Sequence, residues 1–226
     1  MYKLFIANKN YSSWSLRPWV LMKTLGLAFE EVLLPFQAAQ APQFGAVSPT
    51  GRVPCLQDGQ RLVWDSLAMT EYLAERHAGV WPQDEDARAF ARCAVAEMHS
   101  GFAALRSHCG MNCAVRVTLR EVPTSVQADL ARIDALWTEG LKRFGGPFLA
   151  GKRFSAVDAF FAPVAFRIQT FELQLSETSQ RYAQNLIMQP AMMDWYQQAL
   201  AEAWRDEPHE AHAKSVAAVF HDLRVA

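Results

Sequence analysis

Residues 11–18 read YSSWSLRP, three serines around a tryptophan and then arginine and proline, directly after a short apolar run. The apolar run has the composition of a strand, and the segment that follows keeps helical spacing until a glycine stops it. Ser12, Ser13 and Ser15 are therefore expected at or just inside the beginning of a helix. One of them can serve as the N-cap, and three hydroxyls are more than capping needs. The free N–H groups of a helix N-terminus favour a bound anion or thiolate, to which a serine hydroxyl can donate.

The first 80 residues alternate between strand and helix patterns in the order βαβ, connection, ββα. Asp58-Gly59 is a dipeptide favoured in tight turns, so the two strands around it are expected to form an antiparallel hairpin. The connection at 36–50 is expected to be irregular. The predicted strands are 3–7, 29–34, 53–57 and 62–64, and the predicted helices are 15–25 and 65–77.

After Trp81-Pro82 the sequence changes to long amphipathic segments without strand character. Prolines and a Gly-Gly-Pro run separate these segments. The predicted helices are roughly 84–114, 123–144, 155–171 and 179–203. The sequence thus predicts an α/β domain at 1–79 and an all-α domain at 84–226, joined by a short linker at 79–84.

Composition narrows the class of protein. The chain of 226 residues has 22 basic and 23 acidic side chains and a formal net charge of −1, so no nucleic-acid or anionic-membrane footprint is visible. No apolar run approaches a signal-peptide core or the ~20 residues of a membrane span, and a cytoplasmic location is expected.

The four cysteines form no CxxC pair and are expected to be free thiols in a reducing compartment. Cys109 and Cys113 lie one helical turn apart near His108, which raises the alternative of a metal site. Zinc sites usually bring a second ligand pair at recognisable spacing, and none is present, so no metal is expected.

Two further dipeptides begin structural elements in the first domain. Val53-Pro54 precedes a strand, where proline is tolerated, and an X-Pro bond is where a cis peptide occurs. A trans bond fits this position, and so does a cis bond that turns the Val53 backbone toward a ligand. Asp65-Ser66 begins a helix. Asp65 can be its cap, or the pair can hold both ends of an amino-acid head group, the amine on the carboxylate and the carboxylate on the hydroxyl and backbone.

A βαβ-ββα order with SSxSxxR at its first helix, VP before its third strand and DS at its third helix resembles the glutathione transferase superfamily over essentially the whole chain. The run Phe154-Ser155-Ala156-Val157-Asp158 is similar to the superfamily's internal capping box, in which Ser155 caps a helix and Asp158 returns the hydrogen bond. The resemblance implies a thioredoxin-like first domain with a mixed four-stranded sheet, an all-α helical bundle as second domain, a homodimer, and glutathione as co-substrate.

Within the superfamily, the stretch from Ser12 to Arg17 is similar to the zeta-class SSCxxR, whose first serine assists the glutathione thiol. It departs from that pattern at Trp14, where the zeta class has cysteine. The resemblance implies Ser12 as the catalytic hydroxyl, Ser13 and Ser15 as supporting donors, and Arg17 as a nearby positive or structural group. It also implies a set of contacts to glutathione: the Val53 backbone on the cysteinyl part with Pro54 cis, Asp65 and Ser66 on the γ-glutamyl end, and Arg52 on the glycyl carboxylate.

The electrophile is expected between the domains, against the first helix of the second one. Apolar walls with a cationic or hydrogen-bonding end would suit an aromatic or carboxylated electrophile. Ordinary core packing is the alternative for the apolar members of this helix. The candidate residues are His99, Arg106, Met111, Asn112 and Arg116, with Arg167 as a further anion-binding candidate.

The expected function is that of a glutathione transferase, which activates the glutathione thiol for attack on a small electrophile by conjugation or peroxidase chemistry. Two alternatives stay open. One is a zeta-like isomerase of an unsaturated diacid (maleylacetoacetate isomerase), and the other is a non-catalytic binding or regulatory module with the same fold.

Overall fold

The computed structural model describes residues 1–36 and 42–224. Its first part contains a four-stranded mixed sheet of order β2-β1-β3-β4, in which β1 runs parallel to β2 and antiparallel to β3. This confirms the predicted βαβ-ββα order and the mixed sheet. The elements are β1 (Tyr2–Ile6), α1 (Ser13–Thr24), β2 (Phe29–Leu33), α2 (Pro42–Val47), β3 (Cys55–Asp58), β4 (Arg61–Val63) and α3 (Ser66–Ala74).

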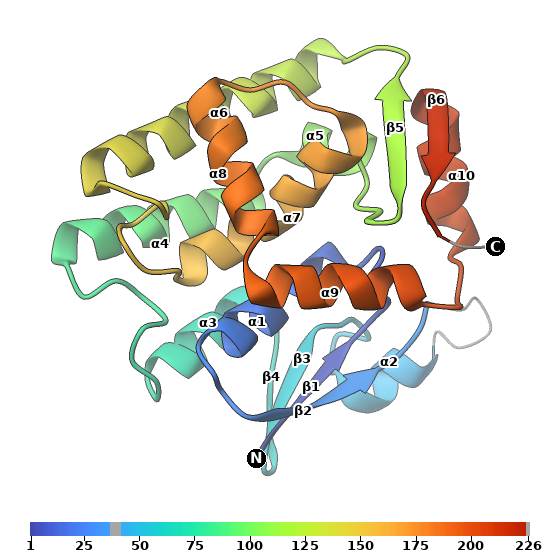
Figure 1. Cartoon of the computed structure of the whole chain (residues 1–226). Coiled ribbons are helices and arrows are strands. Elements are labelled where there is room, and N and C mark those ends of the chain that lie inside the picture. The colour runs from blue at the N-terminus through green and yellow to red at the C-terminus, as the bar shows by residue number, and fades with distance from the viewer. Residues whose placement is uncertain (37–41, 225–226) are drawn as a thin grey trace.

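The second part is mainly helical and lies above the sheet in Figure 1, with α1 and α9 at the junction between the two. Its centre is α7, in which every residue except Gln169 is buried. The elements are α4 (Glu85–Ser100), α5 (Ala103–His108), β5 (Val115–Leu119), α6 (Thr124–Phe144), α7 (Ala156–Phe171), α8 (Glu177–Ile187), α9 (Pro190–Ala201), α10 (Glu207–Val216) and β6 (Ala217–Asp222).

The capping box predicted at the start of α7 is present. Asp158 Oδ2 accepts a hydrogen bond from Ser155 N at 2.9 Å. Its other oxygen accepts from Leu149 N at 3.0 Å and from the Tyr182 hydroxyl at 2.8 Å. The carboxylate therefore fixes both the beginning of the central helix and the loop before it.

Three details correct the sequence-based elements. The helix expected over 84–114 ends at Ser100, where Gly101 adopts an extended backbone with φ of −106° and ψ of −165°. A Cβ at this position would sit 2.8 Å from Glu97 O, so the turn suits glycine. Phe102 follows in the left-handed region with φ of 55°, and α5 then begins in a new direction. The helical part also contains a two-stranded antiparallel sheet, β5 with β6, where no strand was expected. Finally, α2 occupies part of the connection expected to be irregular, and residues 37–41 of that connection lie outside the described residues.

Candidate functional site

The N-terminus of α1 carries a short chain of hydroxyl groups. Ser12 is the N-cap: its Oγ accepts from Ser15 N at 3.4 Å and donates to Ser15 Oγ at 2.7 Å. Ser15 Oγ in turn accepts from Ala7 N at 3.2 Å, at the end of β1. Ser15 is fully buried, whereas Ser12 and Ser13 line a pocket. Hydroxyl hydrogens rotate, so Ser15 can equally donate to Ser12 and leave the Ser12 proton for a group in the pocket.

Two adjoining pockets of about 550 and 590 Å³ meet at this helix. They share Trp14, Arg52, Val53 and Arg106 as lining residues. The first pocket extends along the helical part and is lined by the serines Ser12 and Ser13 with Tyr11, Phe36, Met111, Arg167 and His209 among others. The second extends over the sheet part and is lined by Thr50, Pro54, Trp64 and Asp65 besides the shared residues. The two pockets form a groove across both parts of the molecule.

The sheet side of the groove brings together Val53, Pro54 and Asp65 from the two predicted dipeptides, whereas Ser66 is not among its lining residues. The Val53-Pro54 peptide bond is cis, so the cis alternative is the one realised. Asp65 is the N-cap of α3, and its Oδ1 accepts from Leu67 N at 3.0 Å. Its other oxygen lies 3.3 Å from His99 Nε2. Ser66 is fully buried, and its Oγ has no hydrogen-bond partner among residues 1–36 and 42–224.

Positive charge is concentrated around Trp14. The guanidinium groups of Arg17 and Arg106 lie over its ring, at 4.2 and 4.7 Å from the centroid. Arg17 is 2% exposed, and neither its Nε nor its Nη1 has a partner in the part of the chain that the structure describes. Burial lowers the pKa of the Arg17 guanidinium well below its usual range, and the charges of Arg106 and Arg167 lower it further. A buried cation without a hydrogen-bonded counterion is costly, which points to an anionic ligand.

Known proteins are similar to the N-terminal part of this chain and to most of its length. Residues 11–76 match the family model for the glutathione S-transferase N-terminal domain. The chain is 23% identical over 168 residues to a glutathione S-transferase-like protein, OpS6 of Beauveria bassiana, covering 71% of this chain and 76% of that protein. It is 28% identical over 161 residues to glutathione S-transferase F14 of Arabidopsis thaliana, covering 66% and 63%.

Solved structures share the fold. A glutathione transferase homolog from Burkholderia with bound glutathione superposes with a TM-score of 0.68 at 22% identity, covering 89% of this chain and 99% of that one. Glutathione transferase F2 of Populus trichocarpa gives 0.66 at 17% identity, covering 89% and 100%. Ure2p in complex with glutathione gives 0.64 at 17%, covering 85% and 96%. Residues 11–76 thus correspond to the glutathione S-transferase N-terminal domain, and the similarity to these solved structures over most of the chain shows that the fold is that of the glutathione transferases.

In this fold, the residues predicted for the electrophile separate into two groups. Arg106 and Met111 line the helical-side pocket. His99 contacts the Asp65 carboxylate and the Trp14 ring, and both of these residues line the groove. Burial lowers the pKa of His99, and the charges of Arg17 and Arg106 lower it further against the opposing charge of Asp65.

The remaining two candidates are not brought to the groove. Asn112 accepts from Asn10 Nδ2 at 2.9 Å and so ties the two parts of the molecule together. Arg116 donates to two backbone carbonyls and to the Tyr196 hydroxyl, and it lines neither pocket. Both follow α5, whose change of direction the sequence did not reveal.

Three lining residues of this transferase fold had no place in the sequence-based site. Tyr11 donates its hydroxyl to Glu210 at 2.5 Å, and burial together with this bond raises its pKa, so its proton is already committed. Phe36 and His209 stack with ring centroids 5.7 Å apart. His209 comes from α10 near the C-terminus, and only the fold places it here. Tyr11 directly precedes Ser12 in the sequence, so its place near the site could have been predicted from the local pattern.

The thiols near this site are structural. Burial raises the pKa of Cys109 to about 12 and also raises that of Cys113, which donates to Lys9 O. Within residues 1–36 and 42–224, no three His, Cys, Asp or Glu side chains are grouped as metal ligands would be.

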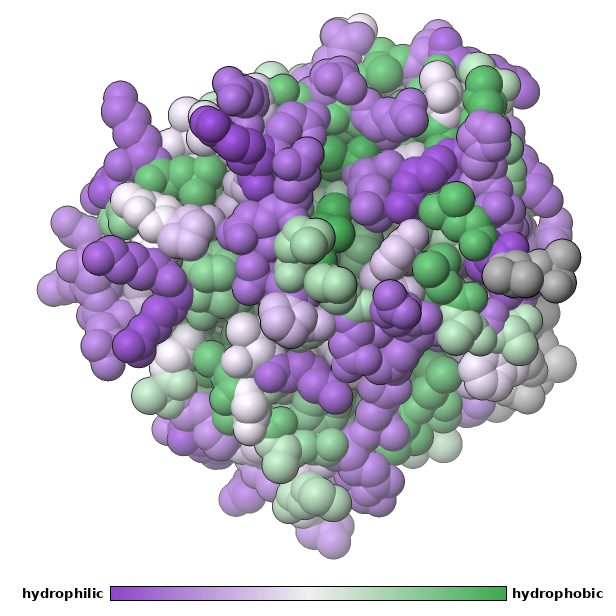
Figure 2. Space-filling model, in the orientation of Figure 1, coloured by the Kyte–Doolittle hydropathy of each residue, from purple (hydrophilic) through white to green (hydrophobic). Residues whose placement is uncertain are grey.

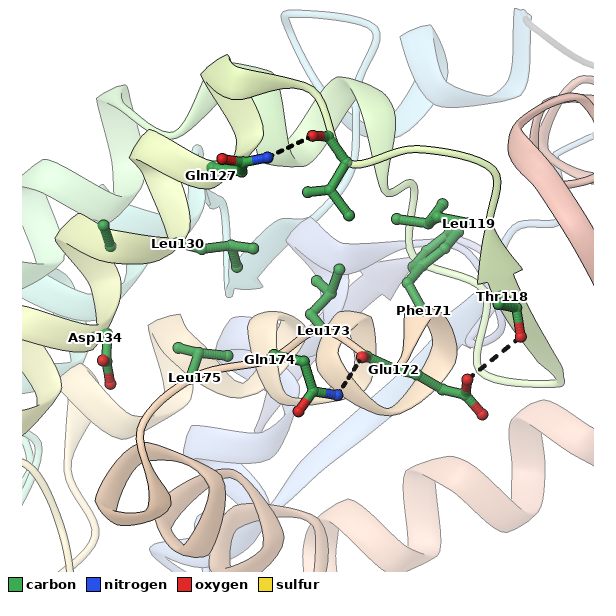
Figure 3. A pocket seen from close by; sticks show the side chains of 12 residues that line it. Thr118, Leu119, Gln127, Leu130, Asp134, Phe171, Glu172, Leu173, Gln174 and Leu175 are labelled. Atoms are coloured by element: carbon green, nitrogen blue, oxygen red, sulfur yellow. Dashed lines mark hydrogen bonds between the residues drawn. The ribbon is translucent and has the colours of Figure 1, made fainter.

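Another pocket, of about 500 Å³, lies in the helical part between β5, α6 and the end of α7 and is shown in Figure 3. Leu119, Leu130 and Leu173 give it an apolar floor. Its acidic groups are already engaged: Glu172 accepts from Thr118, and Asp134 accepts from Ser176. It contains neither unpaired cations nor the hydroxyl chain, so the groove at α1 is the candidate site.

None of the helices in the described ranges is long and apolar enough to cross a membrane. Hydrophilic and hydrophobic side chains are interspersed over the face seen in Figure 2.

Proposed function

We propose that this protein is a glutathione transferase that binds glutathione in the groove and activates its thiol through Ser12. The observation that carries the proposal is the hydroxyl pair at the start of α1: Ser12 lines the pocket, and Ser15 lies behind it at 2.7 Å. Conjugation to a small electrophile is the proposed reaction. The homodimer and the cytoplasmic location remain predictions from the resemblance and the composition.

The sheet side of the groove suits the peptide part of glutathione. The Val53 backbone beside the cis Pro54 is proposed to pair with the cysteinyl unit, and Arg52 with the glycyl carboxylate. Asp65 and Ser66 would hold the γ-glutamyl amine and carboxylate. The buried Ser66 Oγ has no partner in the described part of the chain, which supports this assignment because such a hydroxyl is usually satisfied in a folded protein. Glutathione in the matched Burkholderia and Ure2p structures supports it at the level of the family.

The chemistry required of Ser12 is modest. A thiol with a pKa of about 8.5 is only ~3% ionised at pH 7, and lowering its pKa by ~2 units takes ~2.7 kcal/mol. A charge-assisted hydrogen bond contributes ~1.5–3 kcal/mol and a helix N-terminus ~0.3–1 kcal/mol. With Ser15 donating to Ser12, the Ser12 proton points to the sulfur. The thiol proton leaves to solvent, and the thiolate forms the new C–S bond as the leaving group departs with its electron pair.

The test is the thiolate absorbance of bound glutathione as a function of pH. In the wild type we expect a thiol pKa near 6–7, about 2 units below the free value. Ser12→Ala should still bind glutathione but lose the shift, whereas Ser12→Thr, which keeps a hydroxyl, should retain most of it. Ser13→Ala shows whether the neighbouring hydroxyl shares the role, and the exposed Ser125→Ala is the control.

Two outcomes would contradict the proposal. Glutathione bound to the wild type with an unshifted thiol would remove the catalytic role of the serine. Absence of glutathione binding would favour the alternative of a non-catalytic module.

A further inference from the structure

The helical side of the groove contains cations that the glutathione contacts proposed above do not use. Arg167 is 4% exposed and lines this pocket, and its one hydrogen bond to the described residues joins Nε to Cys109 O at 2.8 Å. Arg106 also lines it and directs Nη1 to the carbonyls of His99 and Gly101 at the end of α4. Neither arginine forms an ion pair with any residue in the described ranges.

The acidic groups near this pocket already have hydrogen-bond partners. Glu210, which holds Tyr11, is paired with Arg224 at 2.8 Å. Asp206 is in contact with His209 Nδ1. Among the described residues that line this pocket, none carries a carboxylate. An anion entering here would meet Arg106 and Arg167, with Arg52 as a third lining arginine, and no acidic side chain from residues 1–36 or 42–224.

Three of the lining residues of this pocket form an aromatic cluster. Phe36 and His209 stack with an interplanar angle of 20°, and Tyr11 lies 5.0 Å from His209, centroid to centroid. Stacked rings of this kind offer a planar ligand apolar contact over its faces. The volume of about 550 Å³ suits a single ring with substituents beside the cysteinyl end of glutathione.

We propose that the helical-side pocket binds a planar anionic ligand, with its acid group on Arg167 and Arg106 and its ring beside Phe36 and His209. Its role as the second substrate, an aromatic or conjugated carboxylic acid with an electrophilic carbon, rests on the proposed transferase function. Arg167 is then the residue that selects acids over neutral electrophiles of the same shape. Guanidinium suits this task because it meets a carboxylate with two parallel hydrogen bonds.

Binding is tested first, without any reaction. The probes are 3,5-dinitrobenzoate and its neutral isostere 3,5-dinitrobenzamide, titrated calorimetrically into the wild type with and without glutathione. We expect the acid to bind about 10- to 100-fold more tightly than the amide, the range of charge-assisted hydrogen bonds. Equal affinity for the two probes would overturn the proposal without recourse to any variant.

Substitutions then assign the preference to a residue. Arg167→Gln should reduce the acid-to-amide ratio to within about 3-fold, and Arg167→Lys, which keeps the charge but not the fork, should be intermediate. The matched control is Arg120→Gln, because Arg120 makes the same kind of bond, Nε to Ala217 O at 2.8 Å, and lines neither pocket. It should leave the ratio unchanged. A ratio insensitive to Arg167→Gln in a folded variant would overturn the assignment.

Reaction is tested with 4-chloro-3,5-dinitrobenzoate and the corresponding benzamide. The glutathione thiolate forms a C–S bond at the ring carbon that carries chlorine, and chloride leaves with the C–Cl electron pair. Relative to the uncatalysed rates, kcat/KM should favour the acid, mainly through KM. A preference in binding without any conjugation would support the anion site and refute the transferase. Conjugation of both compounds without preference would support the transferase and refute the anion site.

Discussion

Individual side chains of the candidate site place positive charge in the protein interior, which lowers the stability of the fold. Arg17 lies between the rings of Trp14 and Phe160, 4.2 and 4.8 Å from their centroids, without a carboxylate bonded to it. Cation–π contacts recover part of the desolvation cost, about 2 kcal/mol when buried, but not all of it. Such an arrangement is expected where a ligand supplies the missing negative charge.

Substitution of Arg17 is expected to affect the stability of the fold and the binding of glutathione in opposite directions. Arg17→Met keeps an apolar side chain of similar length and removes the buried charge, so we expect the unfolding free energy without ligand to rise by about 1–3 kcal/mol. Stabilisation by added glutathione should shrink. Thermal unfolding with and without glutathione measures both. Arg181→Met, at an exposed position on α8, should change neither. A lower Tm for Arg17→Met would show that the aromatic contacts outweigh desolvation.

How far the site could be predicted depends on sequence separation. Ser12, Ser13 and Arg17 fall within six consecutive positions at one helix start, so the local pattern sufficed to bring them together. Arg167 was visible only as a candidate, and His209 not at all, because their approach depends on how α7 and α10 pack. Asn112 and Arg116 were expected at the electrophile because the helix predicted over 84–114 contains Asn112 and ends two residues before Arg116, whereas the structure ends that helix at Ser100.

At the element scale, the position of α7 depends on one buried carboxylate. Asp158 accepts from Ser155 N, Leu149 N and the Tyr182 hydroxyl, which belong to the helix start, the preceding loop and α8. Together with the Ser155 hydroxyl, which donates to Oδ2 at 3.4 Å, four buried donors thus depend on a single side chain.

Asp158→Ala is therefore expected to lower the unfolding free energy by at least about 3 kcal/mol, since each buried donor left without a partner costs about 1–3 kcal/mol. Ser155→Ala should cost only about 1 kcal/mol, the usual value for a lost N-cap side chain. Urea unfolding of the three proteins gives the comparison. Similar losses in both variants would mean that the carboxylate acts as a cap alone and does not hold the loop and α8.

The elements that the sequence missed have identifiable causes. Gly101 and Phe102 end α4 through a close approach and a left-handed residue, and such backbone geometry leaves little trace in hydrophobic spacing. The strand β5 did carry a signal, since Val115 and Val117 alternate with the less buried Arg116 and Thr118. Its partner β6 lies about a hundred residues later, and a pairing that distant is not visible in a local pattern.

At the scale of the whole molecule, the C-terminal segment ties the first part to the last. The Arg224 side chain, 3% exposed, donates to Glu210 on α10 at 2.8 Å and to Asp222 on β6 at 2.6 Å. It also lies 3.2 Å from the Tyr11 hydroxyl, next to the hydroxyl chain of the site. The position of Tyr11 in the pocket wall thus depends on residues near the other end of the chain.

Arg224→Gln should reveal this connection through its dependence on pH. Burial raises the pKa of Glu210, but hydrogen bonds from Arg224 and Tyr11 outweigh it, and the Arg224 hydrogen bond lowers the pKa of Asp222. Carboxyl groups with lowered pKa stabilise the fold above their ordinary values of 4.5 and 3.8, and this stabilisation disappears as pH falls through the lowered folded values. We expect Arg224→Gln to cost about 3 kcal/mol at pH 7, and the difference from wild type to narrow steadily below about pH 4. Urea unfolding across this range measures the difference, with Arg76→Gln in an exposed pair as the control that should cost little. A difference that stays constant down to the acid limit would mean that Arg224 acts by packing, and the charged connection between Tyr11 and the C-terminal segment would have to be abandoned.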